Sequence, residues 1–231
     1  MIVVLTGAGI SKDSGIATFR DSDGLWANYR IEDVCTPEAL ARNRKTVIEF
    51  YNERRREVLE KEPNAAHIAL AELEKTHDVH VITQNIDNLH ERAGSRNITH
   101  LHGEITKLRS SIDELATVPL EGWEQKLDAR HPDGSLLRPY VVFFGESVPM
   151  LPEAIEIAQK ADVFVIIGTS LNVYPAASLA SYVRPDVPIY IVDPADPTLV
   201  KSSYITNPIT YIQERAAVGV PRLVERLKST Y

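Results

Sequence analysis

Short apolar segments alternate with helical patterns along most of this 231-residue chain, and no other feature constrains the fold as strongly. Buried parallel strands are typically continuous apolar runs, because helices cover both faces of a parallel sheet. The predicted strands are residues 2–5, 79–83, 98–101, 140–144, 163–167 and 189–192. Helices between them favour a Rossmann-like α/β fold with a mostly parallel sheet and helices on both faces.

Capping and proline signals predict where the helices begin. Thr36-Pro37 is typical of a helix N-terminus and predicts one helix that extends to about Leu59. Asn64 is expected to cap a second helix, whose apolar residues follow the helical period. Further helices are predicted at 154–160 after Pro152, after Pro175, and over 218–227.

Two stretches exceed a minimal Rossmann-like fold. Residues 37–76 contain a helical pair, and residues 105–138 are polar and turn-rich with little periodicity. We expect these two stretches to form a small module, inserted into a Rossmann-like domain made of residues 1–36, 77–104 and 139–231.

Composition excludes several classes of protein. The net charge of −7 argues against a nucleic-acid binder, since such proteins usually present a basic surface to phosphates. Cys35 is the single cysteine, so neither an intramolecular disulfide nor a Cys₄ zinc site can form. No apolar run approaches the ~20 residues that span a bilayer. Met1 leads directly into an apolar run without a basic signal-peptide region, which favours a cytoplasmic protein that binds no membrane.

A glycine turn, Gly7-Ala8-Gly9, follows the first predicted strand. Such turns can bring backbone amides close to a phosphate. The dinucleotide fingerprint G-x-G-x-x-G needs a third glycine, but this chain has Lys12 there, and no acidic residue follows a second strand at the usual distance. Taken alone, the turn is better explained as an ordinary strand-to-helix connection than as a dehydrogenase site.

The wider set of motifs resembles the sirtuin family. The segments similar to its NAD-binding loop are Gly7-Ala8-Gly9-Ile10-Ser11, Ser14-Gly15-Ile16, Thr18-Phe19-Arg20-Asp21 and Gly24-Leu25-Trp26. Four further motifs follow in the family's order, namely Thr83-Gln84-Asn85-Ile86-Asp87, His102-Gly103, Phe144-Gly145-Glu146 and Gly168-Thr169-Ser170. The resemblance implies NAD-dependent removal of acyl groups from lysine side chains of proteins, yielding nicotinamide and O-acyl-ADP-ribose.

The same resemblance assigns roles to individual residues. His102 would be the general base, a role that suits a side chain titrating near neutrality. Asn85 and Asp87 would place the nicotinamide and its ribose. The other implied NAD contacts are Gly7, Ala8, Gly9, Ser11, Phe19, Arg20, Trp26, Gln84, Ile86, Gly168, Thr169, Ser170, Asp193 and Ala216. Asp193 stands where the family usually has asparagine.

Other residues are expected to bind the acylated peptide. The resemblance places Val142, Phe144, Gly145, Glu146 and Val173 along the peptide groove, where the substrate would add as a strand.

The acyl group itself is expected to meet Tyr51 and Arg54. These residues are three apart on one predicted helix face and resemble the Tyr-x-x-Arg pair of sirtuins that remove succinyl and malonyl groups. A guanidinium can hold the acyl carboxylate by a bidentate pair. Cys35 stands where those enzymes tend to have a small alanine, so we expect both deacetylase and desuccinylase activity. Arg55 and Arg56 are expected on a solvated basic surface.

Typical sirtuins carry two Cys-x-x-Cys pairs between the catalytic histidine and the Phe-Gly-Glu motif. Residues 103–143 of this chain contain no cysteine. We expect apolar packing to hold the module instead, with contributions from Leu108, Ile112, Leu115, Trp123 and Leu127.

A histidine metal site is a weaker alternative. His100 and His102 would share one face of a strand and could bind a metal with His80. No carboxylate or thiol cluster accompanies them in the sequence, so we expect no metal site.

Two other functions stay open. One is ADP-ribosyl transfer or NAD hydrolysis by the same nicotinamide-releasing step. The other is a non-catalytic module that binds acyl-lysine or ADP-ribose, which would be expected to lack at least one of His102, Asn85 and Asp87, all present here.

Overall fold

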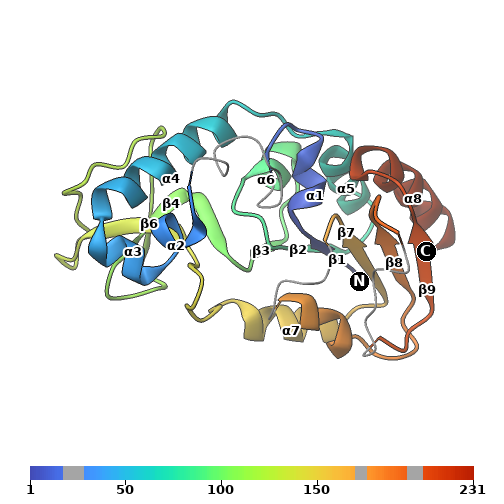
Figure 1. The fold of residues 1–231 in the computed structure, drawn as a ribbon. Coiled ribbons are helices and arrows are strands. Elements are labelled where there is room, and N and C mark those ends of the chain that lie inside the picture. Colours follow the sequence, from blue (N-terminus) through green and yellow to red (C-terminus); the bar gives the residue numbers. More distant parts are fainter. Residues whose placement is uncertain (18–28, 170–175, 197–204) are drawn as a thin grey trace.

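The computed structural model describes residues 1–17, 29–169, 176–196 and 205–231. Its largest element is a six-stranded sheet with strand order β3-β2-β1-β7-β8-β9 (Figure 1). The strands are β1 (Ile2–Thr6), β2 (Val79–Thr83), β3 (Ile98–His100), β7 (Val163–Ile167), β8 (Ile189–Val192) and β9 (Ile209–Ile212). Every pairing is parallel, which confirms the predicted Rossmann-like sheet.

Helices cover both faces of this sheet (Figure 1). On one face, Val4 packs in a cluster with residues of α5 (Ala65–Glu74) and α8 (Ala216–Thr230). On the other face, Val3 and Leu5 pack in a cluster with residues of α7 (Leu151–Gln159) and the 3₁₀ helix η2 (Ala176–Tyr182). Successive residues of β1 therefore face opposite layers, and all five residues of the strand are buried.

The direction in which the sheet grows reverses at β1. From β1 the chain runs to β2 and β3 on one side, and it later returns to β7 on the other side of β1. Connections that leave neighbouring strands in opposite directions open a gap at their carboxyl ends, where ligands of open α/β sheets bind.

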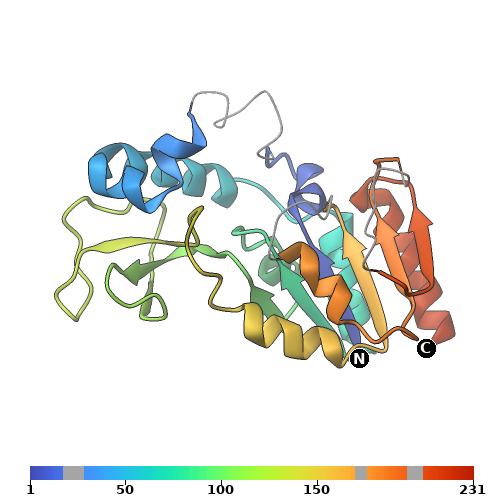
Figure 2. The ribbon, with the colours of Figure 1, turned by 60° about the horizontal axis from the view of Figure 1, so that its bottom comes forward.

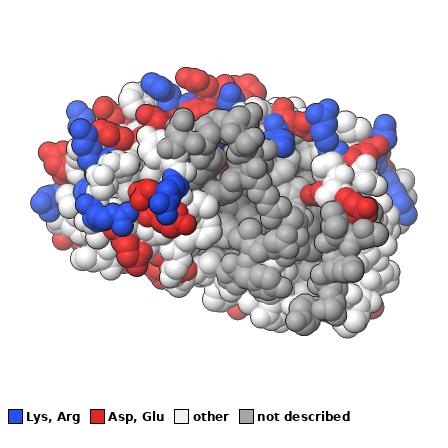
Figure 3. Space-filling view, in the orientation of Figure 1, with Lys and Arg blue, Asp and Glu red and all other residues white. Residues whose placement is uncertain are grey.

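A second, smaller unit lies at the far end of the molecule from α8 (Figures 1 and 2). Its antiparallel sheet has the order β5-β4-β6, formed by β4 (Gly103–Ser110), β5 (Thr117–Pro119) and β6 (Leu137–Val141). Its helices are α2 (Ile31–Val34), α3 (Pro37–Arg42) and α4 (Arg44–Leu59). Side chains of α4, including Phe50 and Tyr51, form a third apolar cluster with Ile105 and Phe143. Figure 3 shows acidic and basic side chains interspersed over this end of the molecule.

The structure differs from the predicted domain boundaries in two places. Helix α5, which the sequence places in the small module, packs against α8, and its Leu70 and Leu73 join the core of the parallel sheet. The predicted strand 140–144 is displaced to β6, which pairs antiparallel with β4 in the small sheet. Residues 142–144 do not form a parallel strand. Their apolar character reflects the packing of Phe143 into the third apolar cluster.

The predicted caps are confirmed, although the first helix is divided. The hydroxyl of Thr36 accepts a hydrogen bond from the Ala39 amide, and Asn64 forms a capping box with His67. The predicted helix 37–59 breaks at Asn43, whose side chain caps α4. None of the helices in the described part of the chain is long and apolar enough to cross a membrane.

The third apolar cluster does pack inside the small module, but the prediction that the module is held by five named apolar residues is wrong for four of them. Leu108 is buried, but Ile112, Leu115, Trp123 and Leu127 are 78%, 63%, 41% and 42% exposed. Arg55, expected on a solvated surface, is instead fully buried, whereas Arg56 is exposed.

Arg55 of α4 is the central polar anchor. Its guanidinium donates to the carbonyl oxygens of Ile105 at 2.6 Å and Trp123 at 2.7 Å, and to Oδ1 of Asn52 at 2.8 Å. Asn52 in turn donates to the carbonyl of Gln125 at 2.9 Å and accepts from its amide at 2.8 Å. Irregular segments leave backbone groups unpaired, and a buried guanidinium supplies the donors they need.

Candidate active site

The candidate site lies at the carboxyl edge of the parallel sheet, where the segments after β1, β2 and β7 meet. The amide of Gly7 donates to the carbonyl of Ile167 at 3.0 Å, and the amide of Gly9 to that of Gly168 at 2.9 Å. A Cβ atom on Gly9 would lie 2.6 Å from Cα of Gly168, which itself has a φ of +59°. The glycines of two predicted cofactor motifs therefore allow the two loops to touch each other.

Ser11 and Asn85 connect the first loop to the segment after β2. Asn85 donates through Nδ2 to the carbonyl of Gly7 and to Oγ of Ser11, both at 3.1 Å. The Ser11 hydroxyl then donates to Oδ2 of Asp87 at 2.9 Å, and the Leu89 amide donates to Oδ1 of Asp87 at 3.1 Å. Ser11, a predicted cofactor-binding residue, thus orients both the carboxylate of Asp87 and the side-chain amide of Asn85.

Asp87 is almost completely buried, with 4% of its surface exposed. Burial raises the pKa of its carboxyl above the ordinary value, and the hydrogen bonds from Leu89 and Ser11 oppose that shift. The carboxylate is therefore held by donors that favour its charged form.

Gln84 joins the third predicted cofactor segment to the other two. Its Nε2 donates to the hydroxyl of Thr169 at 3.2 Å. Segments 7–11, 84–87 and 168–169, which lie far apart in the sequence, are therefore connected by direct hydrogen bonds.

His102, the predicted base, lies between β3 and β4. Its Nδ1 is 2.9 Å from the carbonyl oxygen of Gln84. A carbonyl can only accept, so Nδ1 carries the proton and Nε2 is the basic nitrogen. Burial lowers the pKa of the imidazole below its ordinary value of 6.5. A neutral imidazole with a fixed tautomer is the form that a general base requires.

The structure does not combine His100, His102 and His80 into one group. His80 Nε2 bonds to the Thr99 hydroxyl at 2.9 Å, while His100 Nδ1 lies 3.0 Å from the carbonyl oxygen of Asn85.

Tyr51 and Arg54, the predicted acyl-binding pair, are both buried on α4. The Tyr51 ring stacks on Phe143 at 5.6 Å, and its hydroxyl donates to Sγ of Cys35 at 3.5 Å. Burial raises the pKa of the Cys35 thiol to about 11, so the thiol stays protonated near neutral pH.

The Arg54 guanidinium is engaged by groups of the protein itself. Nη1 donates to Oε2 of Glu57 at 2.7 Å, and Nη2 donates to the carbonyl of Ala17 at 3.0 Å. The sequence analysis did not single out Glu57, although an acid three residues after an arginine on a helix is a recognisable pair.

The predicted peptide segment lies beside His102. The Val142 amide donates to the carbonyl of His102 at 3.0 Å, and the Phe144 amide donates to that of Cys35 at 2.9 Å. Phe144 is half-exposed, and Gly145 has a φ of +89°.

Glu146 faces the protein rather than the surface. Its carboxylate accepts two hydrogen bonds from Arg138, one from Arg109 and one from the Phe143 amide. These contacts fix the shape of the segment.

The remaining predicted residues are less closely connected. Oδ1 of Asp193, after β8, accepts from the Ala195 amide at 2.8 Å, and Ala216 begins α8 and is buried. Ala8 begins the short helix α1 (Ala8–Lys12), and Ile86 packs against the third apolar cluster. Phe19, Arg20, Trp26, Ser170 and Val173 lie outside the described residues.

The sequence analysis included Thr83, at the end of β2, in the second motif but gave it no role. Its hydroxyl accepts a hydrogen bond from the Asn85 amide at 3.0 Å and so supports the loop that follows the strand.

Comparisons with known proteins agree with this geometry. Residues 7–175 match the model of the Sir2 family. The chain is 57% identical to a protein of Aggregatibacter actinomycetemcomitans named NAD-dependent protein deacylase, over 83% of this chain and 92% of the relative. It is 49% identical to a protein of the same name from Bacteroides thetaiotaomicron, over 98% of this chain and 97% of the relative.

Solved structures give the same result. A Sir2 homologue in complex with ADP-ribose has a TM-score of 0.86 and 38% identity, with 99% of this chain and 92% of that chain covered. A Sir2 homologue in complex with NAD has a TM-score of 0.85 and 38% identity, with 99% and 89% covered. This chain belongs to the Sir2 family, the sirtuins.

Proposed function

We propose that this protein is an NAD-dependent protein-lysine deacylase that releases nicotinamide and O-acyl-ADP-ribose. The observation that carries the proposal is the hydrogen-bonded connection of Asn85, Asp87 and His102 through Ser11 and Gln84 at one edge of the sheet. The named relatives and the structures with NAD and ADP-ribose support the same activity.

The chemistry of the converging groups fits NAD. Asn85 and Gln84 present amides, Thr169 presents a hydroxyl and Asp87 presents a carboxylate at the crevice beside β1. These groups match the carboxamide and the ribose hydroxyls of a dinucleotide. NAD supplies the ribose carbon that is attacked and nicotinamide as the leaving group.

His102 would act as the proton acceptor. Its Nε2 would take a proton from a ribose hydroxyl, while the carbonyl of Gln84 holds Nδ1 and keeps the ring oriented. The lowered pKa keeps the ring neutral at pH 7, so that it can accept this proton.

The substrate would be an acylated lysine of a protein segment that adds as a strand. Segment 142–145 supports this mode, because Val142 and Phe144 are already held to the backbones of His102 and Cys35, and Gly145 follows them with a left-handed conformation. Main-chain recognition tolerates many sequences, so broad protein substrates are expected. The net charge of −7 favours proteins over nucleic acids as substrates.

Arg54 and Tyr51 support desuccinylation alongside deacetylation. A succinyl carboxylate could take the place of Glu57 on the Arg54 guanidinium, whereas an acetyl group offers no such partner. Arg54→Met should therefore reduce desuccinylation far more than deacetylation, and equal losses would contradict a carboxylate-binding role.

The small module is proposed to fold without a structural metal. Arg55 and Asn52 supply its central contacts, and the single cysteine lies outside residues 103–143. Protein treated with EDTA should still unfold in a cooperative urea transition, while loss of that transition would reveal a metal that the module requires to fold.

The activity is tested by measuring nicotinamide release from NAD with and without acetylated and succinylated peptides. Release that depends on peptide and is lost in His102→Tyr supports the deacylase. Release without peptide would indicate NAD hydrolysis, and no turnover with either peptide would indicate a binding module.

A further inference from the structure

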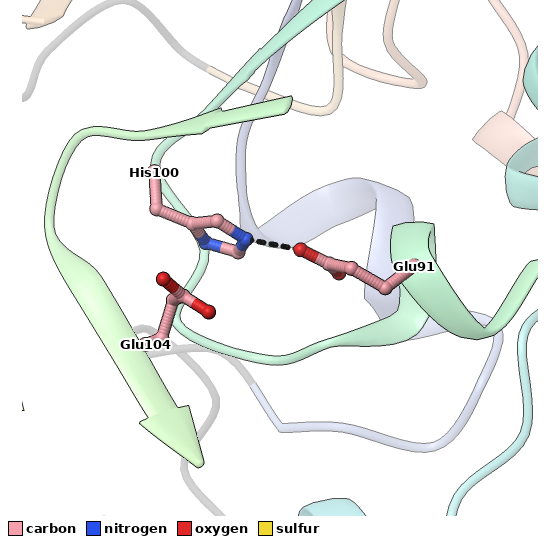
Figure 4. Close-up of side chains that lie close together, drawn as sticks. All are labelled: Glu91, His100 and Glu104. Carbon is pink, nitrogen blue, oxygen red and sulfur yellow. Dashed lines mark hydrogen bonds and ion pairs between the residues drawn. The ribbon is translucent and has the colours of Figure 1, made fainter. Parts of the chain in front are cut away.

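We propose that Glu91, His100 and Glu104 form a binding site for a divalent cation, Zn²⁺, next to the catalytic loop. Glu91 lies in α6 (Leu89–Ala93), His100 ends β3 and Glu104 lies near the start of β4. One ligand atom from each residue lies within 4.8 Å of the other two. Figure 4 shows the three side chains directed toward one another. The site is separate from the cofactor and acyl groups discussed above.

His100 is oriented as a metal-binding histidine would be. Its Nδ1 lies 3.0 Å from the carbonyl oxygen of Asn85, so Nδ1 donates, and Nε2 is directed to the Glu91 carboxylate. Histidines that bind metals nearly always donate their other ring nitrogen to a carbonyl or carboxylate, which fixes the tautomer. His100 is also buried, with only 7% of its surface exposed, so packing holds the ring in this orientation.

The ligand atoms must shift before a metal can enter, since one pair is too close and the set spans up to 4.8 Å. Nε2 of His100 is 2.6 Å from Oε1 of Glu91, the distance of a hydrogen bond. Two ligands of one tetrahedral zinc lie roughly 3.3 Å apart, given metal–ligand bonds of about 2.0 Å. Glu91 is an exposed residue on a short helix, so its side chain can withdraw by this amount and also offers a path of entry.

The charges favour a divalent ion. In the metal-free protein the two ring nitrogens of His100 face the Asn85 carbonyl and the Glu91 carboxylate, so the ring is an imidazolium, and a Glu104 oxygen lies within 4.8 Å of the cluster's other ligand atoms. Lys107 lies 2.7 Å from Glu104 and balances the remaining negative charge. When Zn²⁺ binds, the Nε2 proton leaves to solvent and Lys107 moves off Glu104. Two carboxylates and a neutral imidazole then match the ion's two positive charges.

The donor set selects the metal. One imidazole with two carboxylates suits Zn²⁺ better than Mg²⁺ or Ca²⁺, which prefer sites made of oxygen alone. Three protein ligands leave the fourth position for water. The sequence analysis set aside a metal at His100 because no carboxylate or thiol cluster accompanies it in the sequence, but the fold brings Glu91 and Glu104 together with it.

Metal binding at this site would leave the hydrogen bond between His100 and the Asn85 backbone in place. Nδ1 of His100 donates to the Asn85 carbonyl whether Nε2 carries a proton or a metal, so the loop bearing Asn85 keeps its support. We therefore expect bound Zn²⁺ to raise the thermal midpoint without being required for turnover.

Calorimetric titration of the metal-stripped protein with Zn²⁺ tests the site. His100→Asn keeps a side-chain donor for the Asn85 carbonyl but has no group at the position of Nε2, and Glu104→Gln removes a charged ligand. Each should weaken Zn²⁺ binding by at least about tenfold, because even indirect partners of metal ligands contribute 10- to 100-fold. Lys107→Met should tighten binding, since Glu104 is then free, and this gain is not explained by misfolding.

Matched controls are His80→Asn and Glu62→Gln, a histidine and a glutamate that lie outside the cluster; both should bind Zn²⁺ as the wild type does. The proposal is overturned if the wild type shows no saturable binding, or if His100→Asn binds Zn²⁺ with unchanged affinity. Binding lost only in His102→Asn would place the ion at the catalytic histidine and would also overturn it.

Discussion

Nδ1 of His102 lies 2.9 Å from the backbone carbonyl oxygen of Gln84, and this contact connects the base to the cofactor loop. The side chain of the same Gln84 donates to Thr169 on the loop after β7. The orientation of the base and the arrangement of two cofactor segments therefore depend on one residue. Any displacement of the 84–87 segment would also misplace Nε2 of His102.

The pH dependence of activity should report His102. Burial lowers the pKa of this imidazole below 6.5, so the neutral, basic form persists into mildly acidic solution. The acid limb of kcat/KM should have its midpoint below pH 6.5, with activity falling as the pH drops through the lowered pKa. His80→Gln, a control outside the site, should keep the same profile. A midpoint above pH 6.5 would contradict the assignment.

The Ser11→Ala substitution should lower kcat/KM for NAD, while the free energy of unfolding should change less. The substitution leaves the buried Oδ2 of Asp87 without its Ser11 donor and removes one of the two acceptors of Asn85 Nδ2. An unsatisfied buried group costs about 1–3 kcal/mol, which corresponds to roughly tenfold or more in rate if it misorients Asp87.

The control for that substitution is Ser95→Ala. Ser95 is also buried, but its hydroxyl has no hydrogen-bond partner in the described part of the chain. Steady-state kinetics should show little change for the control, and equal losses in both variants would argue against a specific role of Ser11.

Glu57→Gln should shift acyl selectivity toward succinyl-lysine. The Glu57 carboxylate accepts a hydrogen bond from the Arg54 guanidinium. When this carboxylate is removed, a carboxylate on the acyl chain can take its place on Arg54. The ratio of kcat/KM for succinylated over acetylated peptide should rise severalfold. Glu53→Gln, an exposed glutamate on the same helix, should leave the ratio unchanged. A falling ratio for Glu57→Gln would show that this carboxylate helps Arg54 instead.

Arg55→Met should destabilise the protein strongly. The substitution removes donors from the carbonyls of Ile105 and Trp123 and from Asn52, at a cost of at least about 3 kcal/mol if each buried acceptor contributes about 1 kcal/mol. Leu115→Ser, at a 63% exposed position, should change stability by no more than about 0.5 kcal/mol. Urea unfolding measures both, and the reverse order would contradict the anchoring role of Arg55.

The parallel sheet could be predicted closely because its strands are continuous apolar runs. The predicted bounds 79–83, 163–167 and 189–192 are those of β2, β7 and β8. Strand β9 was missed, since its residues are half-buried or exposed at the edge of the sheet and include polar Thr210. Strand β6 contains Arg138 and Pro139, which gave no strand pattern.

Contacts between distant segments could not be predicted from local patterns. Arg55 sits in a run of three arginines that is typical of a solvated helix surface, and only the fold brings carbonyl groups of residues 105 and 123 to it. In the site, motif order predicted which segments converge. Motif order did not predict that Ser11 bridges Asn85 and Asp87, or that Glu57 forms an ion pair with Arg54.

The most direct test of the account is the stoichiometry of products from NAD and an acetylated peptide. Wild-type protein should release one nicotinamide for each lysine freed of its acyl group, and His102→Tyr should lose both products together. Nicotinamide released without deacylated lysine, or deacylation that persists in His102→Tyr, would contradict NAD-dependent deacylation with His102 as the base.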